Sequence, residues 1–192
     1  MMNQLVKQAQ AGDPAAQQEL WKANSRWVAA IVLAHRPRTI EVDDLMQDVA
    51  VKLVSRIDTL REASAFRPWL RQIVINVCRG AARAQKQTLR LADASDDLAD
   101  SGVRDSVSVP ESNSGISTED MARRDAASHL LQQAMTLPTE YREPLLLRCV
   151  QSLTYQQISD ILNLPITTIE TRLARARRML REELAQEVGD EE

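Results

Sequence analysis

The sequence predicts an all-α protein made of two helical domains that a flexible acidic linker joins. Good helix formers, above all Ala, Leu, Gln, Arg and Glu, dominate its composition. Apolar residues recur at helical spacing in two blocks, and this periodicity disappears between them. We therefore expect an N-terminal domain at residues 1–90, a linker at 91–120, a C-terminal helix-turn-helix domain at 121–185 and an acidic tail at 186–192.

The first block contains three predicted helices. Asp13 before Pro14 is a typical helix start, because Asp caps free backbone amides and Pro suits the first helical position. Pro37 interrupts the pattern, and further helices begin near Asp43 and Phe66. The apolar positions expected to form the core are Leu20, Trp21, Trp27, Val28, Ile31, Val32, Leu45, Met46, Val49, Ala50, Leu53, Val54, Ile57, Trp69, Leu70, Ile73, Val74 and Val77.

The last block is typical of a helix-turn-helix. Thr154 and Gln157 have the spacing of a capping box, and Asn163 with Pro165 marks a tight turn after a short helix. The apolar stripe of the next helix is Ile169, Leu173, Ala176 and Leu180. Its Thr and Arg residues must therefore point elsewhere, as in a helix that enters the DNA major groove. The alternative is an ordinary helical hairpin with solvated arginines.

Charge is segregated along the chain. The net charge of -3 by itself gives no sign of nucleic-acid binding. However, residues 61–90 contain seven basic residues and only one acidic residue, Glu62. A second basic cluster covers residues 172–181. Between them, eight acidic residues and only Arg104 as a basic residue occupy positions 93–120, which predicts a tether that is disordered when free.

Enzymatic and metal-binding motifs are missing from the sequence. There is no Gly-rich phosphate loop and no nucleophile elbow. His35 and His129 are isolated and suit surface or helix-end positions. Cys78 and Cys149 are far apart, so we expect two reduced core residues and neither metal nor cofactor. The polar N-terminus and the shortness of the longest apolar run, residues 27–34, predict a cytoplasmic protein.

Motifs in both blocks resemble the extracytoplasmic-function (ECF) sigma factors of the sigma-70 family. In the last block these are Leu137-Pro138, Arg142 and residues 153–158 (LTYQQI) and 168–177 (TIETRLARAR). In the first block they are residues 11–16 (AGDPAA), 43–49 (DDLMQDV) and 66–70 (FRPWL). The resemblance implies an alternative sigma factor without catalytic activity. Its implied partners are promoter DNA, the clamp helices and flap of core RNA polymerase, and an anti-sigma factor, which much of the family uses.

The resemblance assigns the helix after residue 42 to the polymerase clamp. The residues on that helix that fall off the apolar stripe, and are therefore available for this contact, are Asp44, Gln47, Asp48 and Lys52. The alternative is a solvated acidic face.

The following loop and helix are assigned to the −10 element. A base leaves the stack only if a pocket replaces its stacking, and nearby cations hold the backbone. The assigned residues are Arg61, Phe66, Arg67, Arg71, Asn76, Arg79 and Arg83. Trp69 shares a helical register with Ile73, which favours core burial, while core and stacking roles both stay open for Phe66.

The last helix is assigned to the −35 duplex, and its expected DNA-binding residues are Thr167, Thr168, Glu170, Thr171, Arg172, Arg175 and Arg178. Gly80 stands where the family commonly has Asp, Thr167 where it has Gly, and Glu170 where it often has a basic residue. These differences bear on the promoter sequence and not on the class of activity. Two rival functions, a stand-alone helix-turn-helix regulator and a helical adaptor that binds only proteins, leave part of the pattern unexplained.

Overall fold

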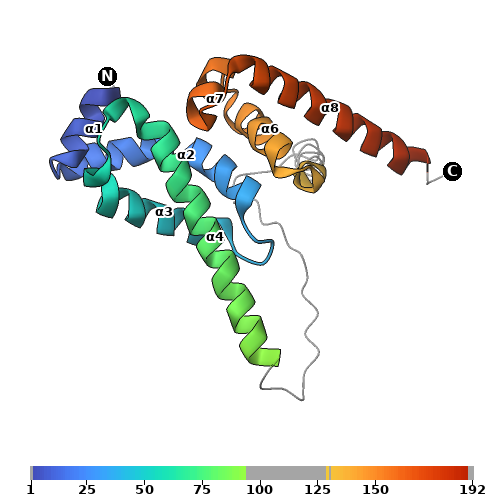
Figure 1. Cartoon of the computed structure of the whole chain (residues 1–192), viewed down its shortest axis with the longest axis horizontal. Helices are drawn as coiled ribbons and strands as arrows, with labels where there is room; N and C mark the ends of the chain where they lie inside the picture. Colours follow the sequence, from blue (N-terminus) through green and yellow to red (C-terminus); the bar gives the residue numbers. More distant parts are fainter. Residues whose placement is uncertain (1, 94–128, 130, 190–192) are drawn as a thin grey trace, which may run out of the picture.

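The computed structural model describes residues 2–93, 129 and 131–189, and all regular structure within them is helical (Figure 1). The helices are α1 (Met2–Gln10), α2 (Pro14–His35), α3 (Val42–Arg56), α4 (Phe66–Asp93), α6 (Thr139–Gln151), α7 (Tyr155–Leu162) and α8 (Ile166–Gly189), with 3₁₀ turns at Ile57–Thr59 and Ala63–Ala65. Residues 131–136 are also helical. The all-α prediction is confirmed, while the predicted acidic linker lies outside the described residues apart from its first three positions.

Helix α2 is the central element of the first helical group, α1 to α4. The Asp13 carboxylate accepts hydrogen bonds from the backbone amides of Ala15 and Ala16, and Pro14 opens the helix, as the sequence predicts. Helices α1, α3 and α4 all pack against α2. The helix ends at His35, directly before the predicted break at Pro37.

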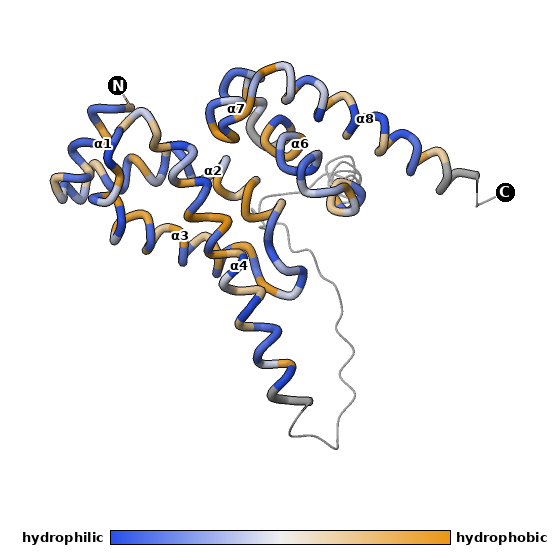
Figure 2. Tube along the Cα trace, viewed as in Figure 1, coloured by the Kyte–Doolittle hydropathy of each residue, from blue (hydrophilic) through white to orange (hydrophobic). Residues whose placement is uncertain are grey.

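Helix α4 differs along its length. Its first half buries Leu70, Val74 and Val77 in the core. Its C-terminal half extends away from the other helices and is mainly hydrophilic (Figures 1 and 2). The four basic residues Arg79, Arg83, Lys86 and Arg90 are all exposed there, at steps of four, three and four. They therefore lie along one side of the helix.

The helix-turn-helix forms as predicted. Thr154 accepts a hydrogen bond from the Gln157 amide, and the Gln157 side chain accepts one from the Thr154 amide, which completes the capping box of α7. Asn163 ends α7 in the left-handed conformation, with φ of 53°. The residues Ile158, Ile161, Leu162, Ile169, Leu173 and Ala176 are all buried.

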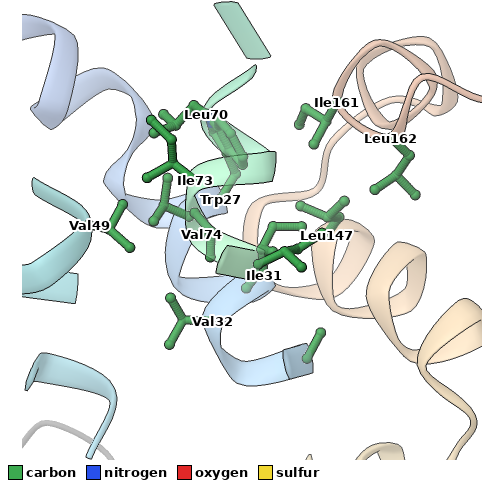
Figure 3. Close-up of a cluster of buried hydrophobic side chains, with 14 of the residues drawn as sticks. Trp27, Ile31, Val32, Val49, Leu70, Ile73, Val74, Leu147, Ile161 and Leu162 are labelled. Carbon is green, nitrogen blue, oxygen red and sulfur yellow. The ribbon is translucent and has the colours of Figure 1, made fainter. Parts of the chain in front are cut away.

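The first group and the second helical group, α6 to α8, share one hydrophobic core. Helix α6 packs on α2, and α7 packs on α4. Figure 3 shows Leu147 of α6 and Ile161 and Leu162 of α7 facing Ile31 of α2 and the side chains of α4. Each of the three is at most 5% exposed. Burial of one such side chain is worth about 1.5–3 kcal/mol. The sequence pattern did not predict this contact.

Two side chains expected in the core lie outside it. Val54 is 47% exposed, because α3 rests on α2 and α4 through Leu45, Val49 and Leu53, and Val54 points away from that side. Cys149 is exposed and Cys78 is buried, both as free thiols. The prediction of two core cysteines is therefore right for Cys78 and wrong for Cys149.

Candidate polymerase and nucleic-acid interfaces

The outer face of α3 presents the predicted polymerase-binding residues. Asp44, Gln47 and Asp48 are exposed, and Lys52 is half-buried. The face exists because Leu45, Val49 and Leu53 anchor the opposite side of the helix. In Figure 1, α3 lies below α2 while α6, α7 and α8 lie above it, so the second group leaves this face uncovered.

Two valines extend the same face. Val51 is 62% and Val54 47% exposed, which is unusual for branched apolar side chains. Val51 follows Gln47 by four residues and Asp48 by three, so it lies beside both on the helix surface. Sequence reasoning missed Val51 and assigned Val54 to the core, because a stripe along a helix predicts a wider buried face than α3 has.

Gln10 holds the loop that precedes α4. Its side-chain amide donates hydrogen bonds to the carbonyl oxygens of Ile57 and Leu60, at 3.0 and 2.6 Å. The loop therefore leaves α3 in a defined direction and presents Arg61 to solvent. Phe66 closes the other end of the loop.

Phe66 is 1% exposed, so its ring has no face available for a base in this arrangement. It packs beside Trp69, with ring centroids 6.0 Å apart. Trp69 itself is half-buried against the core, so the predicted core burial of this residue is only partial. Of the two roles left open for Phe66, this arrangement matches burial in the core and not stacking on a base.

The arginines predicted to hold the −10 strand fall into two sets. Arg61, Arg79 and Arg83 are exposed, as is Asn76, whose side-chain oxygen accepts a hydrogen bond from Gln72. In contrast, Arg67 and Arg71 both face carboxylates from the second helical group. The sequence does not show this difference, since all these arginines belong to one basic cluster.

The partner of Arg71 is Glu143 of α6. The guanidinium donates from Nε to Oε1 at 2.6 Å and from Nη2 to Oε2 at 2.7 Å, which is a bidentate pair. His35 Nε2 lies 3.5 Å from the same Oε1. Burial alone would raise the pKa of Glu143, but the hydrogen bonds from Arg71 and the nearby basic groups of Arg71 and His35 outweigh it and hold this pKa below its usual value.

The partner of Arg67 is Asp160 of α7, with Nη1 3.7 Å from Oδ2. Both side chains line an open cavity of about 560 Å³, whose other walls are Met2 and Asn3 of α1, residues 63–66, Pro68 and Asn163. The cavity therefore lies between the loop that precedes α4 and the helix-turn-helix.

The N-terminal half of α8 presents the predicted −35 residues. A shallow depression of about 350 Å³ gathers five of them, Thr167, Thr168, Thr171, Arg172 and Arg175, beside Glu140 and Tyr141 of α6. Glu170 and Arg178 are exposed and do not line it. Arg178 lies 3.5 Å from Glu182 one turn later.

Two α6 residues that sequence reasoning missed contact the arginines of this depression. Glu140 Oε2 is 3.9 Å from Arg172 Nη2, and the Tyr141 hydroxyl accepts a hydrogen bond from Arg175 at 3.4 Å. These contacts orient both guanidinium groups without burying them. No local signal marked the two residues, because their contacts depend on how α6 packs on α8.

Comparisons with known proteins agree with this architecture. Residues 20–88 match the family described as Sigma-70 region 2, and residues 129–180 match Sigma-70, region 4. The ECF RNA polymerase sigma-E factor of Haemophilus influenzae is 26% identical over 181 residues, which is 92% of this chain and 91% of that protein. The sigma-E factor of Escherichia coli K12 is 26% identical over 180 residues, or 92% and 90%. The chain belongs to the ECF sigma factors of the sigma-70 family.

Solved structures share the fold of this sigma factor. CnrH in complex with the cytosolic domain of CnrY matches with a TM-score of 0.63 and 22% identity, over 96% of this chain and 97% of that one. The sigma factor RpoE of Bartonella quintana, in complex with the anti-sigma factor NepR, matches with a TM-score of 0.56 and 20% identity, over 88% and 96%.

Membership of the family defines the activity of this sigma factor. It binds core RNA polymerase and promoter DNA, and it directs promoter-specific transcription initiation. The family is not one of enzymes. Within the described part of the chain, no helix is long and apolar enough to span a membrane, and no three metal-ligating side chains cluster.

Proposed function

We propose that three surfaces of this sigma factor divide the work of initiation. The outer face of α3 docks on the clamp helices of core polymerase, α4 with its preceding loop captures the −10 strand, and α8 reads the −35 duplex. The observation that carries this division is the separation of the three surfaces onto three helices, each anchored by its own buried stripe. Residues 1–90 and 121–185 are the two proposed domains, joined by residues 91–120.

The polymerase surface combines polar and apolar contacts. Asp44, Gln47 and Asp48 supply charge and hydrogen bonds, while Val51 and Val54 supply apolar area that water otherwise covers. Apolar residues at the centre of an interface, with polar residues around them, are the usual arrangement of a protein–protein contact.

The −35 surface combines reading and positioning. Thr171 and Arg172 lie near the start of α8, where side chains of a recognition helix reach base edges. Arg172 can donate two hydrogen bonds to a guanine, which discriminates against other bases by about 1–3 kcal/mol. Arg175 and Arg178 lie further along and suit phosphates, which position the helix without specifying sequence.

The −10 surface uses cations. Arg61, Arg67, Arg71, Arg79 and Arg83 follow one another along the loop and α4, so they can hold the backbone of a displaced strand. Asn76 adds a polar side chain next to them.

We further propose that the protein works in the cytoplasm without catalysing a reaction, and that an anti-sigma factor controls it in a stress response. NepR is such a partner of RpoE from Bartonella quintana, which supports the search for one here.

Run-off transcription with sigma-free core polymerase and genomic fragments tests the proposal. We expect discrete transcripts that depend on the added protein. Arg172→Ala and Arg79→Ala should each lower the yield, while Arg26→Ala, an exposed arginine of α2 outside all three surfaces, should not. Absence of both a polymerase complex and a transcript would contradict the proposed function.

A further inference from the structure

The side chain of Gln10 connects helix α1 to the loop that precedes α4, to which the proposed function gives a role in −10 capture. Helix α1 lies outside residues 20–88, the segment that matches Sigma-70 region 2. We propose that Gln10 is a positioning residue for −10 capture, and that it acts by orienting Arg61. The inference rests on the proposed −10 role of Arg61 and its loop.

The Gln10 amide nitrogen has an acceptor for each of its two hydrogens, and both acceptors belong to the loop. Nε2 donates to the carbonyl oxygens of Ile57 and Leu60, at 3.0 and 2.6 Å. These carbonyls stand at the two ends of the first 3₁₀ turn, where the Leu60 amide also donates to the Ile57 oxygen at 3.2 Å. One side chain therefore fixes both ends of this turn relative to α1.

The second of these hydrogen bonds orients Arg61. The carbonyl group of Leu60 and the backbone amide of Arg61 share one planar peptide group. Because Gln10 holds the Leu60 oxygen, it restricts the direction of this plane and of the backbone that enters Arg61. The restriction exists before the DNA strand arrives, so the strand need not supply the free energy that orders this part of the loop.

Apolar anchors hold the two ends of the loop but not its tip. Ile57 and Leu60 at one end and Phe66 at the other are each at most 5% exposed. Between them, residues 61–65 are exposed apart from the half-buried Ala63. Core packing thus decides where the loop begins and ends, while the hydrogen bonds of Gln10 decide how the backbone is oriented where the exposed tip begins.

The end of α1 has a defined position, which Gln10 needs in order to act on the loop. The helix ends in a Schellman motif, with Gly12 in the left-handed region at φ of 86°. The Gly12 amide donates to the Ala9 carbonyl oxygen at 3.1 Å, and the Asp13 amide donates to that of Gln8 at 3.3 Å. Ala9 is fully buried. Gln10, the last residue of the helix, therefore starts from a fixed backbone.

Two substitutions remove the hydrogen bonds. Gln10→Glu keeps the size of the side chain, but its carboxylate cannot donate and would face two carbonyl oxygens. Gln10→Met removes the donors without adding charge, and it replaces Gln10→Glu in the test if that variant does not fold. Gln17→Glu is the matched control, because Gln17 is also half-buried and its Nε2 donates to the Ala9 carbonyl oxygen at 3.2 Å, not to the loop. Circular dichroism and urea denaturation verify the fold of each variant.

The test uses core polymerase with each full-length variant and two probes from a promoter found by run-off transcription. One probe is duplex DNA from the −35 element to the upstream edge of the −10 element, and the other adds the −10 non-template strand as a single-stranded extension. The ratio of the two affinities measures the −10 contribution. If Gln10→Glu leaves the loop correctly oriented in a tenth of the molecules, this ratio falls by up to about tenfold. The ratio for Gln17→Glu, and the affinity of every variant for the first probe and for core polymerase, should not change.

A double-mutant cycle with Arg61→Ala tests whether Gln10 acts through Arg61. Coupled residues have non-additive effects, so Gln10→Glu should change the ratio much less when residue 61 is already Ala. An unchanged ratio in Gln10→Glu, an equal loss in Gln17→Glu, or additive losses in the double variant would overturn the proposal and leave the −10 role of Arg61 intact. An unchanged ratio in Arg61→Ala would refute that role and the inference with it, although transcription by the unaltered protein would still support its activity as a sigma factor.

Discussion

The indole N–H of Trp27 donates a 2.8 Å hydrogen bond to the side-chain oxygen of Asn24, which lies one turn earlier on α2. Asn24 is buried, and its amide nitrogen donates to the Leu20 carbonyl oxygen at 2.7 Å. A polar pair thus lies on the central helix, inside the core on which both helical groups depend.

Asn24→Ala should destabilise the protein, because the buried Trp27 N–H loses its acceptor. The expected loss is about 1–3 kcal/mol in the free energy of unfolding, the cost of an unsatisfied buried donor. Urea denaturation followed by circular dichroism measures it. The control is Ser25→Ala, at a position outside the core. A loss no larger than that of the control would show that the pair does not stabilise the fold.

Arg172→Ala should weaken discrimination between −35 sequences by about 1–3 kcal/mol, if the guanidinium makes a bidentate contact to a base. Binding to matched and scrambled −35 duplexes measures the difference. Arg178→Ala, by comparison, should lower the affinity for both duplexes equally and should make that affinity less dependent on salt concentration. An equal loss on both duplexes for Arg172→Ala would assign this residue to the phosphates.

Asp48→Arg should reduce affinity for core polymerase by at least about tenfold, or about 1.4 kcal/mol. The substitution reverses a charge at the centre of the exposed α3 face, beside Val51. Affinity measured with labelled sigma factor checks the prediction, with Glu19→Arg as the control. The −35 duplex affinity should be unaffected. Unchanged polymerase binding would remove Asp48 from the interface.

The two cysteines should differ in reactivity. Burial raises the pKa of Cys78 to about 11. Partial burial also raises the pKa of Cys149, although the nearby charges of Arg177 and Arg148 lower it. Iodoacetamide at pH 8 should modify the exposed Cys149 first and Cys78 only after urea is added, as mass spectrometry can follow. Since the folded state disfavours the Cys78 thiolate, stability should also fall as pH rises from about 9 to about 11. Equal modification rates in the native protein would contradict the assignment.

Acid should weaken the contact between the helical groups. The pKa of Glu143 is depressed in the folded state, so its contribution is fully present above the ordinary Glu pKa of about 4.3 and is lost as pH falls through the lower folded value. The free energy of unfolding, measured from pH 6 to pH 3, should therefore fall more steeply in the unaltered protein than in Glu143→Gln. Parallel pH profiles would show that Glu143 is not coupled to stability.

The sequence by itself determined the local structure and the family. The start of α2 at Asp13, the capping box of α7, the turn at Asn163 and the basic character of α8 all follow from residues within a few positions of one another. Caps, periodicity and turn residues act over one or two helical turns, so a linear pattern contains them. The same local motifs carry the resemblance to ECF sigma factors.

Only the tertiary structure decided which side chains meet across the two groups. Arg71 and Glu143 are 72 positions apart, and nothing in their local sequence relates them. The same holds for the exposure of Val54 and Cys149 and for the burial of Phe66, since each depends on which neighbouring helix covers that side. Helical spacing shows that a face is apolar or charged, but the choice of its partner depends on the packing of the whole chain.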